Sequence, residues 1–84
     1  MSEIAVVGTG YVGLTAGACF AHLGHQVVCY DIDKEKIDKL STGEIPIVEK
    51  GLETLVKEGL KENKLSFTTS PQEAVSNCKV VFLC

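Results

Sequence analysis

The chain has 84 residues, which is enough for one small domain or for a piece of a larger one. A chain of this length buries only roughly 60–65% of its unfolded surface, so a free-standing enzyme with two substrate sites is not expected. The net charge of −3 argues against a nucleic acid or an anionic membrane as a partner, because both need a basic face on the protein.

The location expected from the sequence is the cytoplasm. No apolar run approaches the ~20 residues of a membrane-spanning helix, and Glu3 stands where a secretion signal carries basic residues. The cysteines are Cys19, Cys29, Cys78 and Cys84. Their spacing matches neither a zinc site nor a C-x-x-C pair. We therefore expect no metal site and four reduced thiols that serve as small apolar fillers.

The first elements form a strand–helix–strand unit. Ile4–Val7 is an apolar run that ends at Gly8, as expected of a strand buried on both faces of a parallel sheet. Small or apolar residues then recur every three to four positions, which predicts a helix over Tyr11–Leu23 with a small-residue face that packs closely on the sheet. Gly24 is placed to end this helix, and Gln26–Asp31 is the second predicted strand.

Two helices are predicted in the middle of the chain. Asp33 can cap the first of them, with Ile37 and Leu40 facing inward. Gly43 is placed to end this helix, and Pro46 stops any continuation. The next helix is amphipathic, and its apolar positions are Leu52, Leu55, Val56 and Leu60.

The last elements are a strand, a short helix and another strand. Leu65–Thr68 alternates apolar and polar residues, which predicts a strand. Ser70, Pro71 and Glu73 combine a capping box with proline at the first helical position. The apolar run at 79–84 predicts a fourth strand.

This alternation of strands and helices predicts an α/β fold. We expect a Rossmann-type parallel sheet with right-handed crossovers, helices on both faces and strand order 3-2-1-4. A complete sheet of this type has six strands. Residues 1–84 are therefore expected to be the N-terminal part of a larger domain, with the first four strands only.

The main functional signal is Gly8-Thr9-Gly10-Tyr11-Val12-Gly13, a G-x-G-x-x-G motif between the first strand and the first helix. Gly8 permits a tight turn, Gly10 lets the backbone approach a pyrophosphate, and Gly13 lets helix and strand pack closely. The anion would meet backbone N–H groups and the positive end of the helix dipole, so the absence of arginine is no handicap. The motif predicts that a dinucleotide binds here.

An acid follows the motif at the spacing that such a site requires. Asp31 comes eighteen residues after Gly13, at the end of the second strand, where its carboxylate can accept from both hydroxyls of an adenosine ribose. Its charge repels a 2′-phosphate, and Asp33 adds a second negative charge, which favours NAD over NADP. Lys34 and Lys36 weaken this preference, because either can meet a phosphate.

Other interpretations of these features remain. The glycines can form a plain tight turn in a small α/β domain, and an acid at a strand end often caps a loop. A methyltransferase-like adenosine binder also uses a glycine loop and an acid, although the full motif spacing argues against it. A module that senses NAD or an adenine nucleotide without chemistry would need the same loop.

The sequence resembles the UDP-glucose/GDP-mannose dehydrogenase family from Ile4 to Cys84. The glycine motif has the more specific form G-x-G-Y-V-G-L, and the segment GEIPIVEKGLETL at 43–55 is similar to the family pattern G-x-x-P-I-x-E-P-G-L. Ordinary dinucleotide-binding folds lack this second element. Lys50 departs from the pattern, where the family usually has proline, and we expect a looser turn before the helix that follows.

The resemblance implies an NAD-dependent oxidoreductase. Its members oxidise the C6 hydroxymethyl group of a nucleotide sugar to a carboxylate by two successive hydride transfers to NAD. By position, the cofactor residues fall on the loop Gly8–Gly13, on Asp31 and on Lys36. The family's catalytic cysteine lies far downstream, so no catalytic residue is assigned here.

The resemblance also sets the expected partners. The substrate domain is expected to be absent from residues 1–84, so the nucleotide sugar would be bound by a part of the parent protein outside them. UDP-glucose is the expected substrate, with GDP-mannose and UDP-N-acetylmannosamine as alternatives. The parent protein is expected to be a homo-oligomer.

Overall fold

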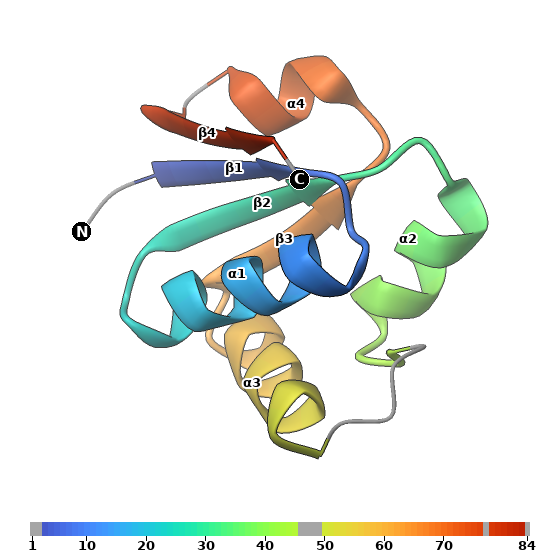
Figure 1. Ribbon diagram of the computed structural model, residues 1–84, viewed down its shortest axis with the longest axis vertical. Coiled ribbons are helices and arrows are strands. Elements are labelled where there is room, and N and C mark those ends of the chain that lie inside the picture. The colour runs from blue at the N-terminus through green and yellow to red at the C-terminus, as the bar shows by residue number, and fades with distance from the viewer. Residues whose placement is uncertain (1–2, 46–49, 77, 84) are drawn as a thin grey trace.

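The computed structural model describes residues 3–45, 50–76 and 78–83. They form a four-stranded parallel sheet with helices on both faces (Figure 1). The strands are β1 (Glu3–Val7), β2 (Gln26–Tyr30), β3 (Leu65–Thr68) and β4 (Val80–Leu83). The helices are α1 (Tyr11–His22), α2 (Lys34–Ser41), α3 (Lys50–Lys61) and α4 (Pro71–Val75). Pro46, which is predicted to stop a helix, lies outside the described residues.

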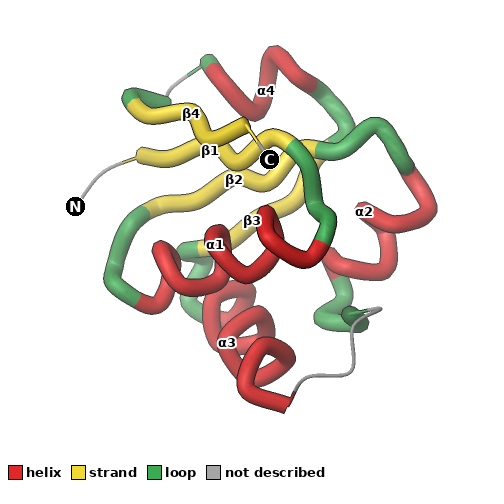
Figure 2. The backbone as a smooth tube through the Cα atoms, in the orientation of Figure 1, coloured by secondary structure: helices red, strands yellow, loops and turns green. Residues whose placement is uncertain are grey.

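The strand order is β3-β2-β1-β4, which confirms the predicted fold class and topology. β1 pairs with both β2 and β4, and its last residue, Val7, lies opposite Tyr30 and Leu83. Helices α1 and α3 lie on one side of the sheet and α4 on the other (Figure 2). The carboxyl ends of β1 and β2 therefore lie side by side at the edge where the glycine-rich loop begins.

The first helix packs on the sheet through small side chains, as predicted. Leu14 and Ala18 are fully buried, and Gly17 between them faces β2. A Cβ atom added at Gly17 would lie only 2.8 Å from Cys29 Sγ. This close approach packs the middle of α1 directly against β2.

Several predicted boundaries move by one residue: β1 begins at Glu3 rather than Ile4, and β4 begins at Val80 rather than at residue 79. α1 ends at His22, with Leu23 as its C-cap, and β2 ends one residue before Asp31. The N–H of Asp31 still donates to the Thr68 carbonyl oxygen at 3.2 Å, so Asp31 stays tied to the end of β3. Asp33 caps α2 as predicted and accepts a hydrogen bond from the N–H three residues later.

The capping box before α4 forms only in part. The Ser70 side chain accepts from the Glu73 N–H at 3.2 Å, with Pro71 as the first helical residue, as predicted. The capping box also predicts a reciprocal bond from the Ser70 N–H to the Glu73 carboxylate, and this part of the prediction is wrong. Thr68 at the end of β3 replaces it, because its hydroxyl accepts from the Ser70 N–H at 3.1 Å and donates to Glu73 at 3.3 Å.

The prediction that the cysteines fill apolar space is wrong for one of them. Cys29 is fully buried, but Cys19 is exposed because it lies two positions beyond Gly17 and faces away from the sheet. Cys78 is half-buried and its Sγ donates to the Ala74 carbonyl oxygen at 3.0 Å. Burial, with a smaller contribution from the Glu3 carboxylate, raises the pKa of the Cys78 thiol. Cys84 lies outside the described residues.

Candidate functional site

The loop between β1 and α1 begins with a backbone turn that favours glycine. Gly8 has a φ of +102°, a conformation that a side chain disfavours. Its N–H donates to the Tyr30 carbonyl oxygen at 2.8 Å, which continues the pairing of β1 and β2 beyond the last residue of the strand. The loop is therefore fixed to the ends of both strands before the helix starts.

The second glycine has no such structural requirement. Gly10 is the N-cap of α1, with φ −69° and ψ −174°, a conformation that any residue adopts. A Cβ atom added at Gly10 would meet no atom within 4 Å. Neither backbone strain nor packing within the described chain thus explains a glycine here. The open space beside Gly10 adjoins the N-terminus of α1.

The start of α1 is suited to an anion. A helix leaves its first N–H groups without acceptors inside the helix, and its dipole places partial positive charge there. The first turn of α1 carries no acidic residue. Tyr11 and Val12 are exposed on it, whereas Gly13 is buried against the sheet, as the motif predicts.

Asp31 lies beside this loop and is held by it. Its Oδ2 atom accepts from the Thr9 hydroxyl at 2.7 Å and from the Thr9 N–H at 3.1 Å, and its Oδ1 atom accepts from the Asp33 N–H at 3.0 Å. The Lys36 Nζ atom lies 3.9 Å from Oδ2. The Asp31 side chain is only 17% exposed. Four of the chain's own groups therefore fix this carboxylate in place.

These contacts also set the charge of the carboxylate. Burial raises the pKa of Asp31, but it is outweighed by the hydrogen bonds from Thr9 and Asp33 and by the charge of Lys36. The pKa of Asp31 therefore lies below its ordinary value of 3.8. An ionised carboxylate only accepts hydrogen bonds, so Asp31 is an acceptor at neutral pH.

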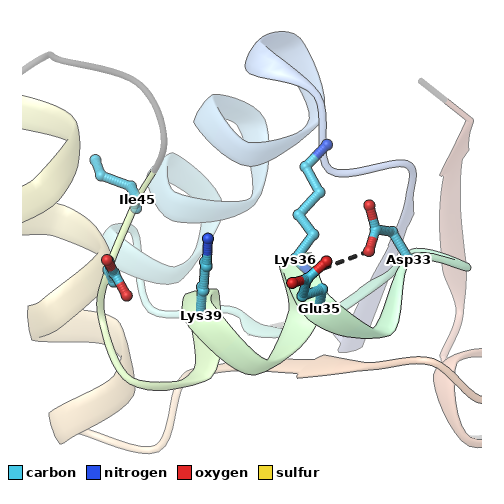
Figure 3. A pocket seen from close by; sticks show the side chains of 6 residues that line it. Asp33, Glu35, Lys36, Lys39 and Ile45 are labelled. Atoms are coloured by element: carbon cyan, nitrogen blue, oxygen red, sulfur yellow. Dashed lines mark hydrogen bonds between the residues drawn. The ribbon is translucent and has the colours of Figure 1, made fainter.

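A pocket of about 310 Å³ adjoins this acid along α2. Its lining residues are Asp33, Glu35, Lys36, Lys39, Glu44 and Ile45. Figure 3 shows the Lys36 and Lys39 side chains standing side by side on one face of α2, with Asp33 at the start of the helix. Because Lys36 lines the pocket and also approaches Asp31, the acid and the pocket form one continuous surface.

The predicted site residues thus come together in the structure. The loop residues, Asp31 and Lys36 meet where β1 and β2 end, although 22 positions separate Thr9 from Asp31. The hydrogen bond from the Thr9 side chain is the feature that the sequence reasoning missed. A hydroxyl residue directly after the first glycine of the motif is the signal that points to it.

A metal centre and a membrane-spanning helix are both absent from the part of the chain that the structure describes. Within 3–45, 50–76 and 78–83, no group of three or more His, Cys, Asp or Glu side chains is arranged to hold a metal ion. None of the helices described there has the length and apolar character needed to cross a membrane.

Comparison with known proteins assigns the chain to a family. Residues 2–84 match the model described as UDP-glucose/GDP-mannose dehydrogenase family, NAD binding domain. The chain belongs to this family. NAD is accordingly the cofactor of the domain, and the family is one of oxidoreductases.

Individual relatives show the same relationship. The chain is 46% identical over 83 residues to UDP-glucose 6-dehydrogenase TuaD of Bacillus subtilis, a match that covers 99% of this chain and 18% of the relative. The chain therefore spans about a fifth of the length of this relative.

Solved structures agree in fold. The UDP-glucose dehydrogenase of Pyrobaculum islandicum matches with a TM-score of 0.94 at 38% identity, covering 100% of this chain and 19% of that one. The GDP-mannose dehydrogenase of Pseudomonas aeruginosa, solved as a ternary complex, matches with a TM-score of 0.92 at 41% identity. That match covers 96% of this chain and 19% of the other.

Proposed function

We propose that residues 1–84 form the N-terminal part of a NAD-binding domain whose loop Gly8–Gly13 holds the cofactor pyrophosphate. Gly10 carries this proposal. The fold itself does not require a glycine there, since φ is ordinary and no atom lies near the missing Cβ. A ligand whose phosphates contact the backbone at the start of α1 does require one.

Asp31 and Lys36 form the adenosine end of this site. The ionised Asp31 carboxylate accepts a hydrogen bond from a ribose hydroxyl, and its charge disfavours the 2′-phosphate of NADP. Lys36 lies on the same side and borders the pocket along α2. The Asp31 carboxylate favours NAD over NADP, whereas the Lys36 ammonium opposes this preference because it can meet a phosphate.

The parent protein would be a nucleotide-sugar dehydrogenase, most specifically one that oxidises UDP-glucose to UDP-glucuronate. Bound NAD supplies the hydride acceptor. The residues of this chain bind and orient that cofactor, and none of them is assigned to catalysis. The identity to a UDP-glucose 6-dehydrogenase supports this substrate.

GDP-mannose is the second candidate substrate, because a GDP-mannose dehydrogenase matches the same residues at 41% identity with a TM-score of 0.92. UDP-N-acetylmannosamine is another substrate within the same family. Substrate choice does not follow from the described residues, since they carry only the cofactor loop and its acid.

The test is NADH formation by the complete reading frame that contains these 84 residues. Purified protein is supplied with NAD and, in separate reactions, with UDP-glucose, GDP-mannose or UDP-N-acetylmannosamine. We expect NADH with UDP-glucose, through two successive oxidations, and little with the other two sugars. Faster NADH formation from GDP-mannose would replace the proposed substrate, and no NADH from any of the three would contradict the dehydrogenase assignment of the parent.

A further inference from the structure

Thr9 contributes more to the site than its place in the glycine loop. Its side chain is 1% exposed, and its hydroxyl and its N–H both donate to the same oxygen, Oδ2 of Asp31, at 2.7 and 3.1 Å. The hydroxyl bond is the shortest contact that the structure gives this carboxylate. A hydrogen bond to an ionised group is about twice as strong as one between neutral groups. The end of β1 is thus bonded directly to the end of β2.

These donors fix how the carboxylate is turned. A carboxylate has about four lone-pair positions, and the Thr9 hydroxyl, the Thr9 N–H and the Asp33 N–H occupy three of them. A position on Oδ1 is left for a ligand hydroxyl. Thr9 is 1% exposed, so its hydroxyl oxygen is closed to a ligand and the residue acts on the site only through Asp31.

A ribose presents two neighbouring hydroxyl groups, and the position left on Oδ1 of Asp31 accepts from one of them. Thr9 is β-branched, so its χ1 rotation is restricted and its hydroxyl is held in one direction. The Asp31 carboxylate is therefore oriented before a ligand arrives, which lowers the entropic cost of binding.

We propose that Thr9 is a positioning residue whose hydroxyl orients the Asp31 carboxylate for recognition of the adenosine ribose. The inference rests on the proposed function, because it assigns Thr9 a role in binding NAD. It assigns the Thr9 side chain, and not only the Thr9 backbone, an effect on how tightly Asp31 binds the ribose.

The experiment compares Thr9→Val, Thr9→Ser and Thr15→Val with the unmodified chain. Thr9→Val keeps the branched shape and removes the hydroxyl, whereas Thr9→Ser keeps the hydroxyl. Thr15→Val is a matched control on α1, because the Thr15 Oγ1 atom is buried without a hydrogen-bond partner among the described residues. Circular dichroism establishes that each variant is folded.

The first readout needs no cofactor. The titration of the Asp31 carboxyl carbon is followed by NMR between acid and neutral pH. The Thr9 hydroxyl lowers the pKa of Asp31, so we expect the midpoint to rise in Thr9→Val and to stay near that of the unmodified chain in Thr9→Ser and Thr15→Val. An unchanged midpoint in folded Thr9→Val would overturn the proposal whether or not NAD binds.

The second readout is NAD affinity as a function of pH. At neutral pH we expect Thr9→Val to bind NAD about tenfold more weakly, the usual effect of losing one hydrogen bond to a charged group. We expect Thr9→Ser to recover most of this loss. As pH falls, Thr9→Val should lose NAD at a higher pH than the unmodified chain, because its acid is protonated earlier.

The two readouts separate the possible failures. Equal NAD affinity of Thr9→Val and Thr9→Ser would overturn the role of the hydroxyl, even if the Asp31 midpoint moves. If the complete reading frame with these residues unmodified binds no NAD, the proposed function fails and the ribose role of Thr9 fails with it. The carboxyl titration still shows in that case whether Thr9 holds Asp31. If Thr9→Val does not fold, a normal midpoint and affinity in Thr9→Ser support the proposal, and their loss overturns it.

Discussion

Replacing Gly10 with alanine is expected to weaken NAD binding strongly while the fold stays intact. The added methyl group would occupy the open space beside the N-terminus of α1, where no protein atom lies within 4 Å. A pyrophosphate drawn to the helix N-terminus would have to contact the backbone through this space. We expect NAD affinity to fall on the order of a hundredfold, as for a lost close approach of phosphate to backbone.

The stability of this variant should barely change. The φ of −69° suits alanine, a less favourable N-cap is offset by reduced freedom of the unfolded chain, and the free energy of unfolding should shift by less than about 1 kcal/mol. Gly51→Ala is the matched control, because Gly51 also has open space around it but lies in α3, away from the loop. Calorimetric titration with NAD should separate the two variants. Equal affinity in both would show that the space beside Gly10 is not used by the cofactor.

Gly59→Ala is expected to lower the free energy of unfolding. The size of this effect should be similar to the loss of NAD binding free energy in Gly10→Ala. Gly59 is buried where α3 packs on β3, and a Cβ atom added there would lie 2.8 Å from Leu65 Cβ and 3.5 Å from Ala21 Cβ. Leu65 Cβ cannot swing aside, because it is attached directly to the strand backbone that pairs with Val27. The helix must move away from the sheet, and such overpacking costs roughly 1–3 kcal/mol.

Gly51→Ala is again the control, since both substitutions lie in α3 and share the gain of about 1 kcal/mol that alanine brings to a helix. Thermal unfolding followed by circular dichroism gives the comparison. Each 1 kcal/mol lowers Tm by roughly 4–8 °C in a domain of this size, so Gly59→Ala should melt well below Gly51→Ala. A higher or equal Tm for Gly59→Ala would mean that α3 does not pack on β3 as closely as described.

Much of the fold was predictable because its signals are local. The apolar run of β1, the small-residue spacing of α1 and the caps at Asp33 and Ser70 each depend on neighbouring residues. The parallel order then follows from the alternation of elements and the handedness of crossovers. The glycine motif and Asp31 were recognisable for the same reason, since their spacing along the chain is fixed by one strand–helix–strand unit.

Contacts between residues far apart in the sequence were not predictable in the same way. The hydrogen bond from Thr9 to Asp31 forms because β1 and β2 end side by side. No periodicity along the chain predicts it. Thr68 displaced the expected bond from the Ser70 N–H to the Glu73 carboxylate for a similar reason, since the end of β3 brings a competing hydroxyl to the start of α4. Cys19 was misjudged because burial of a small residue depends on which side of α1 it occupies.

The most direct test of the cofactor site is calorimetric titration of the 84-residue chain with NAD and with NADP, repeated with Asp31→Ala. The unmodified chain should bind NAD more tightly than NADP, because the Asp31 carboxylate is ionised and faces the ribose end of the site. Asp31→Ala should weaken NAD binding by roughly 10–100-fold, the effect of losing hydrogen bonds to a charged group, and narrow the difference from NADP. Equal binding of NAD and NADP by the folded chain, or NAD affinity unchanged in Asp31→Ala, would contradict the assignment of Asp31 and its loop as the NAD site.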